Sequence, residues 1–172
     1  MGQLLFVTGP VRCGKSRFAL ERALSWGDHV VYVATYRMEP GNEEMLARIR
    51  AHREERPAVW RTLEAPGDLP MALSGLHPPP SGVLLDSLTV WLAERLEASD
   101  LAILEGWERV LEYLLQAPWP TVVVGNEIGW SMAPEEPGIR RFRDLAGRLA
   151  QMTALLSSEA WLLVAGCPVR LK

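Results

Sequence analysis

The chain has 172 residues, of which 48% are hydrophobic and 23% charged, and its formal net charge at pH 7 is −3. This length and composition are typical of one folded domain with a sizeable core, and they exclude global disorder. A slightly acidic chain has no overall basic field, so no nucleic-acid partner is expected. No apolar run approaches the roughly 20 residues of a membrane span.

The first ten residues and the two cysteines predict the compartment in which the protein works. The stretch MGQLLFVTGP has neither the basic region nor the cleavage site of a secretory signal. Cys13 and Cys167 do not make a disulfide framework. We therefore expect a reduced, cytoplasmic protein with a single domain over residues 1–172 and no membrane span.

Short apolar runs alternate along the chain with segments of helical periodicity. The runs predict strands at Leu4–Thr8, Val30–Ala34, Val83–Asp86, Thr121–Gly125 and Ala160–Ala165. Helices are predicted at Lys15–Trp26, Glu43–Arg56 behind an Asn42 cap, Leu88–Leu96, Ala102–Leu115 and Ile139–Leu156. Proline and glycine predict loops at Pro66–Pro70, Leu76–Gly82 and Ala133–Gly138. Nearly continuous Val, Leu and Ile runs indicate strands buried on both faces, so we expect an α/β fold with a mostly parallel central sheet flanked by helices.

The loop after the first strand carries a phosphate-binding motif. The segment GPVRCGKS, from Gly9 to Ser16, matches G-x-x-x-x-G-K-[ST] in full. In this motif backbone N–H groups surround phosphate oxygens, the lysine (Lys15) reaches the β- and γ-phosphates, and the serine hydroxyl (Ser16) binds Mg²⁺. A predicted strand precedes it and a predicted helix follows, so the fold is expected to be P-loop NTPase-like.

Two carboxylates follow later strands. Asp86 ends the third apolar run, where P-loop proteins place a Mg²⁺ carboxylate, although Asp86 or Ser87 can also cap the next helix. Glu127 follows the fourth run and is either a carboxylate at the same sheet edge or part of a turn with Asn126 in a left-handed conformation.

The predicted helix Glu43–Arg56 carries a histidine among arginines. Met45, Ile49, His52 and Arg56 share one helical face. Flanking cations would keep the His52 imidazole neutral and nucleophilic and would hold phosphate oxygens. The same pattern also suits a partly buried histidine on a solvated helix with ordinary salt pairs, and the residues alone leave both interpretations open.

Longer stretches resemble a known family, the bifunctional adenosylcobinamide kinase / adenosylcobinamide-phosphate guanylyltransferases of cobalamin biosynthesis. The shared landmarks run almost end to end: Val7–Gly9, Arg12–Arg17, Val31–Thr35, Met45 with Arg48-Ile49, His52-Arg53, Arg56-Pro57, Trp60–Thr62 with Glu64, Leu84–Thr89, Asn126–Gly129 and Arg141–Arg148. The P-loop is common to many families, whereas HxxxRP…WRTxE joined to NE[IV]G and FRDLAGR is far more specific.

The resemblance implies two reactions. A γ-phosphoryl group passes from ATP or GTP to the aminopropanol hydroxyl of adenosylcobinamide, and a histidine matched by His52 then takes GMP from GTP and transfers it to adenosylcobinamide phosphate. The resemblance also implies that Ser16 and Asp86 bind Mg²⁺ and that Lys15 and His52 are the catalytic residues. It further implies a homotrimer. The nucleotide-binding residues it implies are Gly9, Pro10, Val11, Arg12, Cys13, Gly14, Lys15, Ser16, Ala34, Thr35, Tyr36, Arg53, Glu54, Glu55, Arg56, Glu64 and Asp86.

Some positions depart from the family pattern and leave alternatives open. Pro10 has no N–H to offer a phosphate, and Cys13 stands where the family has serine, so the kinase half could be weakened. A guanylyltransferase without kinase activity, a plain P-loop small-molecule kinase and a nucleotide-binding module are the other interpretations. Phosphate contact and a solvated helix face both suit Arg140, Arg141 and Arg143. The sequence leaves three questions open: whether ATP or GTP donates the phosphoryl group, which residues bind the corrinoid, and whether both reactions use one nucleotide site.

Overall fold

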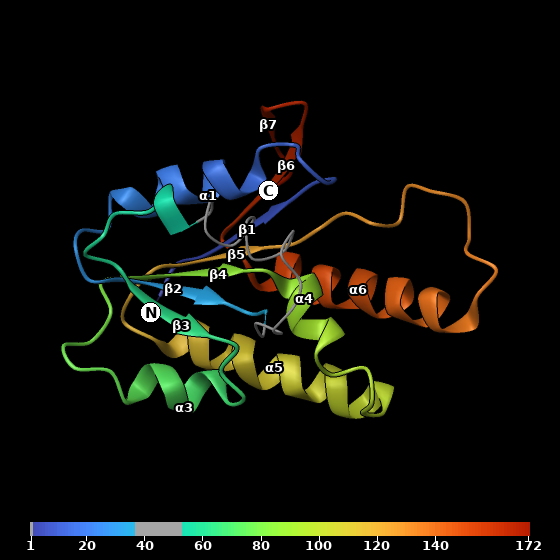
Figure 1. Ribbon diagram of the computed structural model, residues 1–172, viewed down its shortest axis with the longest axis horizontal. Helices are drawn as coiled ribbons and strands as arrows, with labels where there is room; N and C mark the ends of the chain where they lie inside the picture. Colours follow the sequence, from blue (N-terminus) through green and yellow to red (C-terminus); the bar gives the residue numbers. More distant parts are fainter. Residues whose placement is uncertain (1, 37–52) are drawn as a thin grey trace.

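The computed structural model describes residues 2–36 and 53–172 as a single layered sheet with helices on both sides (Figure 1). The strands are β1 Leu4–Thr8, β2 Val30–Ala34, β3 Arg61–Glu64, β4 Gly82–Asp86, β5 Thr121–Val124, β6 Glu159–Val164 and β7 Cys167–Arg170. The helices are α1 Lys15–Leu24, α3 Leu69–Ser74, α4 Leu88–Ala93, α5 Asp100–Gln116 and α6 Pro137–Leu156. Most of the predicted helix Glu43–Arg56, with its Asn42 cap, lies outside the described residues.

The sheet has the strand order β3-β2-β4-β5-β1-β6-β7. All neighbouring pairs are parallel except β6 and β7, which form an antiparallel hairpin. Ala165 and Gly166 make the hairpin turn with φ of 50° and 83°, the positive values that a two-residue turn requires. Because β1 to β5 are parallel, their carboxyl ends all meet at one edge of the sheet.

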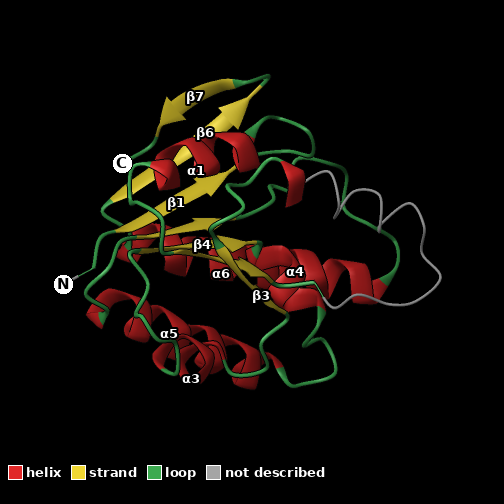
Figure 2. Ribbon diagram, turned by 60° about the vertical axis from the view of Figure 1, so that its left-hand side comes forward, coloured by secondary structure: helices red, strands yellow, loops and turns green. Residues whose placement is uncertain are grey.

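Helices lie on both sides of the sheet, with α1 on one side and α3 and α5 on the other (Figure 2). Alternate residues of each strand pack against different helices. On one face Leu5, Val7 and Leu84 pack with Ala19 and Ala23 of α1. On the other face the next residues along the strands pack with α3, α4, α5 and α6 around a core of buried leucines and tryptophans: Leu73, Leu85, Trp91, Leu92, Trp107, Leu111, Leu145 and Leu149. Burial on both faces explains the continuous apolar runs of β1, β2, β4 and β5.

The mostly parallel sheet confirms the predicted fold class, and all five predicted strands are present with bounds shifted by at most one residue. Three short elements were not predicted: β3 and β7 at the two sheet edges, and α3. The predicted loop Pro66–Pro70 is wrong at its end, because α3 begins at Leu69 behind the Asp68 cap, whose side chain accepts a hydrogen bond from the Met71 N–H. The other two predicted loops end earlier than predicted. Gly82, the last residue of one, belongs to β4, and Pro137 and Gly138, the last residues of the other, belong to α6.

No helix in the described ranges is both long and apolar enough to cross a membrane.

Candidate nucleotide-binding site

The phosphate loop joins β1 to α1 and needs glycine at two positions. A Cβ on Gly9 would lie 2.5 Å from the carbonyl oxygen of Leu163 in β6, so no larger residue fits there. Gly14 precedes α1 with φ 95°, a left-handed value that favours glycine. The chain then enters α1, whose first N–H groups lack helical partners and attract phosphate.

Lys15 is held inside this loop. It is the first residue of α1 and its side chain is only 7% exposed. Its Nζ donates a hydrogen bond to the carbonyl oxygen of Pro10 at 3.1 Å. Ser16 follows in the first helical turn and is half-buried. A cation within the loop and a hydroxyl beside it have the arrangement that triphosphates and Mg²⁺ require.

The register of the sheet brings three predicted residues into one row at its carboxyl edge. Ala34 pairs with Glu64 of β3 on one side and with Asp86 of β4 on the other. The row continues from Asp86 to Val124 of β5, and from Val124 to Val7 of β1, two residues before Gly9. Segments far apart in the sequence therefore converge on the edge where open α/β sheets bind ligands.

A tyrosine, a carboxylate and an arginine form a cluster on the α1 face of this edge. The hydroxyl of Tyr32 donates a hydrogen bond to Oδ2 of Asp86 at 3.0 Å. The guanidinium of Arg56 lies 3.2 Å from the centroid of the Tyr32 ring, in a cation–π contact. Burial, followed by the negative charge of Asp86, raises the pKa of Tyr32, whereas Arg56 opposes that rise. Burial likewise lowers the pKa of Arg56, against the influence of Tyr32 and Asp86.

The cap of α4 is Ser87 rather than Asp86, and the Mg²⁺ role of Asp86 stays a prediction. The hydroxyl of Ser87, not the Asp86 carboxylate, accepts the hydrogen bond from the Val90 N–H at 3.4 Å. The Thr35 hydroxyl accepts from the Ser87 N–H and donates to the Ser87 carbonyl oxygen, both at 2.8 Å. Thr35 thus connects the end of β2 to the start of α4, while the Asp86 carboxylate accepts its hydrogen bond from Tyr32.

The turn after β5 reaches the phosphate loop. The Glu127 N–H donates a hydrogen bond to the Gly9 carbonyl oxygen at 2.9 Å. Asn126 does not have a positive φ, so the predicted left-handed turn is wrong. Its side-chain amide instead donates to the Thr89 hydroxyl of α4 at 2.5 Å. Glu127 therefore lies at the same edge as the P-loop, as one of its two interpretations required.

Comparison with known proteins decides the family of this chain. The family model described as "Cobinamide kinase / cobinamide phosphate guanyltransferase" matches residues 5–171. The chain belongs to this family. As a cobinamide kinase / cobinamide phosphate guanylyltransferase it is a bifunctional enzyme of adenosylcobalamin biosynthesis.

Full-length relatives agree with the assignment. The bifunctional adenosylcobalamin biosynthesis protein CobU of Salmonella typhimurium is 34% identical over 183 residues, covering 98% of this chain and 99% of that protein. The corresponding CobU of Escherichia coli is 33% identical with the same coverage. CobP of Pseudomonas aeruginosa, which has the same description, is 39% identical over 167 residues, covering 96% of this chain and 95% of its own.

Solved structures share the fold of this cobinamide kinase at low identity. A KaiC-like protein from Pyrococcus horikoshii has a TM-score of 0.52 at 14% identity, over 94% of this chain and 70% of its own. The RadB recombinase has a TM-score of 0.53 at 20% identity, over 94% of this chain and 74% of its own. They support the P-loop α/β architecture alone.

The remaining predicted site residues of this chain differ in how far they are exposed to solvent. Val11, Arg12, Arg53, Glu54, Glu55 and Glu64 are exposed near the edge, while Tyr36 is half-buried. Cys13 is buried under the loop, where its Sγ lies 2.6 Å from the position of a Cβ on Gly9, so it packs rather than facing a phosphate. His52 lies outside the described residues.

The α6 arginines bond carbonyl oxygens of nearby loops. Arg143 donates to the carbonyl oxygens of Gly129, Ser131 and Met132. Arg141 pairs with Asp100 and donates to two carbonyl oxygens beyond α4. Arg140 bonds the carbonyls of Pro134 and Glu135. Their guanidinium groups therefore hold loops to α6, and a phosphate contact by any of them stays a prediction.

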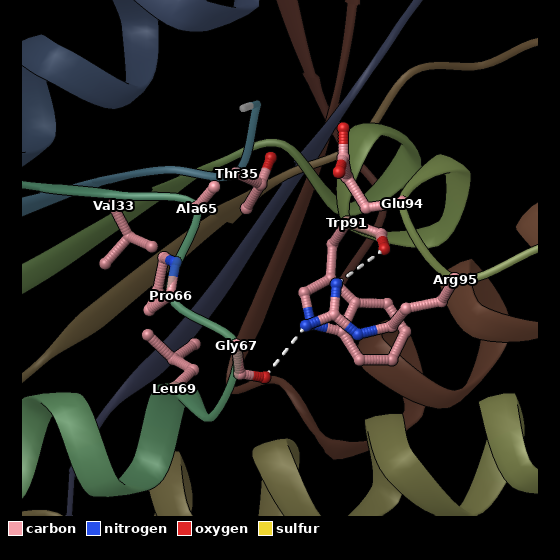
Figure 3. Close-up of a pocket in the computed structure, with 9 residues that line it drawn as sticks. All are labelled: Val33, Thr35, Ala65, Pro66, Gly67, Leu69, Trp91, Glu94 and Arg95. Atoms are coloured by element: carbon pink, nitrogen blue, oxygen red, sulfur yellow. Dashed lines mark hydrogen bonds between the residues drawn. The ribbon is translucent and has the colours of Figure 1, made fainter. Parts of the chain in front are cut away.

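A cavity of about 200 Å³ opens beside the end of β2 on the opposite face of the sheet (Figure 3). Arg95 lies 4.2 Å over the Trp91 ring and donates to the carbonyl oxygens of Trp91 and Gly67. Its guanidinium thus joins α4 to the loop before α3.

Within the described part of the chain, no group of three or more His, Cys, Asp or Glu side chains has the arrangement of a metal site.

Sequence reasoning missed Tyr32 as a site residue. It lies within the apolar run Val30–Ala34, which as a whole predicts a strand buried on both faces. The signal that could have found it is its hydroxyl, because a buried tyrosine needs a hydrogen-bond partner, and Tyr32 precedes Ala34 by two residues on the same face of the strand.

Proposed function

We propose that the carboxyl edge of the sheet binds GTP and ATP and serves both half-reactions: phosphorylation of adenosylcobinamide, then transfer of GMP from GTP to adenosylcobinamide phosphate. The convergence of the P-loop, Asp86 and Glu64 through one row of paired strands is the observation that carries the proposal. We also propose that residues 1–172 form one catalytic domain, since all seven strands belong to one sheet.

In the kinase half, the loop backbone and Lys15 hold the β- and γ-phosphates. The acceptor oxygen of the corrinoid attacks the γ-phosphorus, the bond to the β-phosphate oxygen breaks, and the nucleoside diphosphate leaves. Lys15 neutralises charge that develops on the transferred group and on the leaving oxygen. The donor set of Ser16 and Asp86, a hydroxyl and a carboxylate, suits Mg²⁺. When bound, Mg²⁺ would supply further neutralisation of phosphate charge.

In the guanylyl half, His52 is the nucleophile. A neutral imidazole nitrogen attacks the α-phosphorus of GTP, pyrophosphate leaves, and the phosphate of adenosylcobinamide phosphate then displaces the histidine to give adenosylcobinamide-GDP. Arg56, four positions after His52 in the sequence, lies against Tyr32, whose hydroxyl bonds Asp86, and so provides a cation at the nucleotide edge. Arg53 and Arg56 offer cations to phosphate oxygens.

The altered P-loop does not argue for loss of the kinase half. Pro10 lacks an N–H, yet its carbonyl oxygen accepts the Lys15 bond that keeps the ammonium inside the loop. The Cys13 side chain is buried, while its carbonyl oxygen accepts from the Gly166 N–H at 3.0 Å and ties the loop to the β6–β7 turn. The loop therefore keeps both backbone contacts with Pro10 and Cys13 in place.

Labelled GTP tests the covalent step. The protein is incubated with Mg²⁺ and GTP labelled at the α-phosphate or at the γ-phosphate, then denatured and counted. We expect acid-labile, base-stable label from the α-phosphate alone, absent in His52→Ala. His29→Ala is the matched control, because His29 is an exposed histidine before β2 at the opposite edge. Equal labelling of wild type and His52→Ala would refute the nucleophile, and absence of label from both would refute the intermediate.

We propose a homotrimer in the cytoplasm. Two large apolar side chains, Trp130 and Met132, are 64% and 92% exposed on one loop, as at surfaces that bury against another chain. Cys13 and Cys167 are both unpaired, as in a reducing compartment. Light scattering should return three times the mass of one chain, and a monomer mass at micromolar concentration would contradict the trimer.

A further inference from the structure

The sheet order places Glu127 between the phosphate loop and Asp86. β5 lies between β1, which leads into the P-loop, and β4, which ends in Asp86. Neighbouring strands are about 4.8 Å apart, so the residues that follow β5 are close to both. The hydrogen bond from the Glu127 N–H to the Gly9 carbonyl oxygen, 2.9 Å, fixes the Glu127 backbone directly against the first residue of the P-loop.

The turn that carries Glu127 is held from three sides. The Gly125 N–H donates to the Val7 carbonyl oxygen at 2.8 Å, and the Asn126 amide donates to Thr89 of α4. Downstream, Arg143 of α6 bonds the carbonyl oxygens of three residues between 129 and 132. A carboxylate on a turn anchored in this way has a defined position, which a group acting on a bound substrate needs.

The Glu127 carboxylate is only partly used by the protein. Its Oε1 accepts the Gly129 N–H at 2.7 Å, which orients the group. Within residues 2–36 and 53–172, Oε2 has no hydrogen-bond partner and the carboxylate has no ion pair. The side chain is half-buried. By contrast, Asp86 is bonded to Tyr32, and Glu64 is exposed at the far end of the paired row.

We propose that Glu127 is the general base of the kinase half-reaction. As the corrinoid alcohol oxygen attacks the γ-phosphorus, its proton passes to Oε2 of Glu127 and the bond to the β-phosphate oxygen breaks. A phosphate ester and a nucleoside diphosphate result, and the carboxyl group returns the proton to water. This assignment rests on the proposed kinase function. Transfer of GMP to a histidine removes no proton from an alcohol, so that half-reaction does not need Glu127.

The test compares the two half-reactions in Glu127→Gln, which keeps the shape and removes the basic oxygen. Formation of adenosylcobinamide phosphate from adenosylcobinamide and ATP should fall by about 10²- to 10⁴-fold, the usual contribution of a general base. Labelling of the protein by α-labelled GTP should stay at the wild-type level. Glu127→Asp should keep more kinase activity than Glu127→Gln. Glu135→Gln, an exposed glutamate in the loop before α6, is the matched control and should behave as wild type in both assays.

Each other result overturns the assignment in a distinguishable way. Wild-type kinase rates in Glu127→Gln would remove the base role while leaving the proposed function intact. Equal losses of phosphorylation and of protein labelling would make Glu127 a support of the nucleotide site or of the fold rather than a base. If wild-type protein itself makes no adenosylcobinamide phosphate, the proposed kinase function fails, and the base role fails with it.

Discussion

At the scale of single residues, the side chains around Asp86 show how one strand position serves both core and site. Tyr32 buries its ring under Arg56 and presents its hydroxyl to the Asp86 carboxylate. The hydroxyl fixes the orientation of a carboxylate that we propose as a Mg²⁺ partner, without adding charge to the site.

Replacement of Tyr32 by phenylalanine tests this contact. The change removes a hydrogen bond to a charged group, so the free energy of unfolding should fall by about 1.5–3 kcal/mol at neutral pH in urea titrations. Tyr113→Phe is the control, because the Tyr113 hydroxyl makes no side-chain hydrogen bond within the described residues. An unchanged urea midpoint in Tyr32→Phe would contradict the contact.

The same variant makes a prediction about pH. Because the pKa of Tyr32 is raised in the folded protein, its contribution to stability is complete below the ordinary tyrosine pKa, near 10, and is lost as the pH rises toward the folded value. Wild-type protein should therefore lose stability above about pH 10, and Tyr32→Phe should lose less. Parallel pH profiles for the two proteins would contradict the raised pKa.

At the residue level, the sequence is informative where geometry is local. The P-loop is contiguous, so its spacing alone located Lys15 and Ser16. Neither the Tyr32–Asp86 bond, which spans 54 positions, nor the Glu127–Gly9 bond could be predicted, because each depends on which strands are neighbours. The role of His52 stays a prediction.

At the scale of elements, the connection between β2 and α4 shapes the edge. The Thr35 side chain is 4% exposed, and its hydroxyl satisfies both the N–H and the carbonyl of Ser87. It acts as a buried bridge between a strand end and a helix start, directly beside the residues that we propose bind nucleotide.

Substitution of Thr35 by valine keeps the shape of the side chain and removes the bridge. The buried Ser87 N–H loses its partner, whereas the Ser87 carbonyl keeps the hydrogen bond from the Trp91 N–H at 2.9 Å, so the free energy of unfolding should fall by about 1–3 kcal/mol. Thr35→Ser keeps the hydroxyl and loses one methyl, for which about 1 kcal/mol is expected. Urea denaturation measures both, and a Thr35→Val protein as stable as Thr35→Ser would contradict the bridge.

The elements that the sequence analysis did not predict are the two edge strands, β3 and β7, and the short helix α3. The strands with continuous Val and Leu were predicted because burial on both faces leaves that signature. β3 (RTLE) and β7 (CPVR) are at the two edges of the sheet, where half the strand is solvated and the apolar run disappears. α3 has six residues, too few for helical periodicity to be visible.

At the scale of the whole molecule, the parallel sheet brings residues that are far apart in the sequence to one edge. These residues lie in the P-loop, at the ends of β2, β3 and β4, and in the turn after β5. Alternation of strands and helices predicted the parallel sheet and therefore a shared edge. The strand order was not predictable from the sequence, yet it sets β5 between β1 and β4 and so determines which side chains adjoin the P-loop. Both reactions of the family are consequently attributed to this edge.

A product assay tests that attribution most directly. Adenosylcobinamide, ATP, GTP and Mg²⁺ are incubated with wild type, Lys15→Met or His52→Ala, and the corrinoids are separated and identified by mass spectrometry. We expect adenosylcobinamide-GDP from wild type, neither product from Lys15→Met, and adenosylcobinamide phosphate alone from His52→Ala. Formation of adenosylcobinamide-GDP by His52→Ala, or wild-type yields from Lys15→Met, would contradict the account.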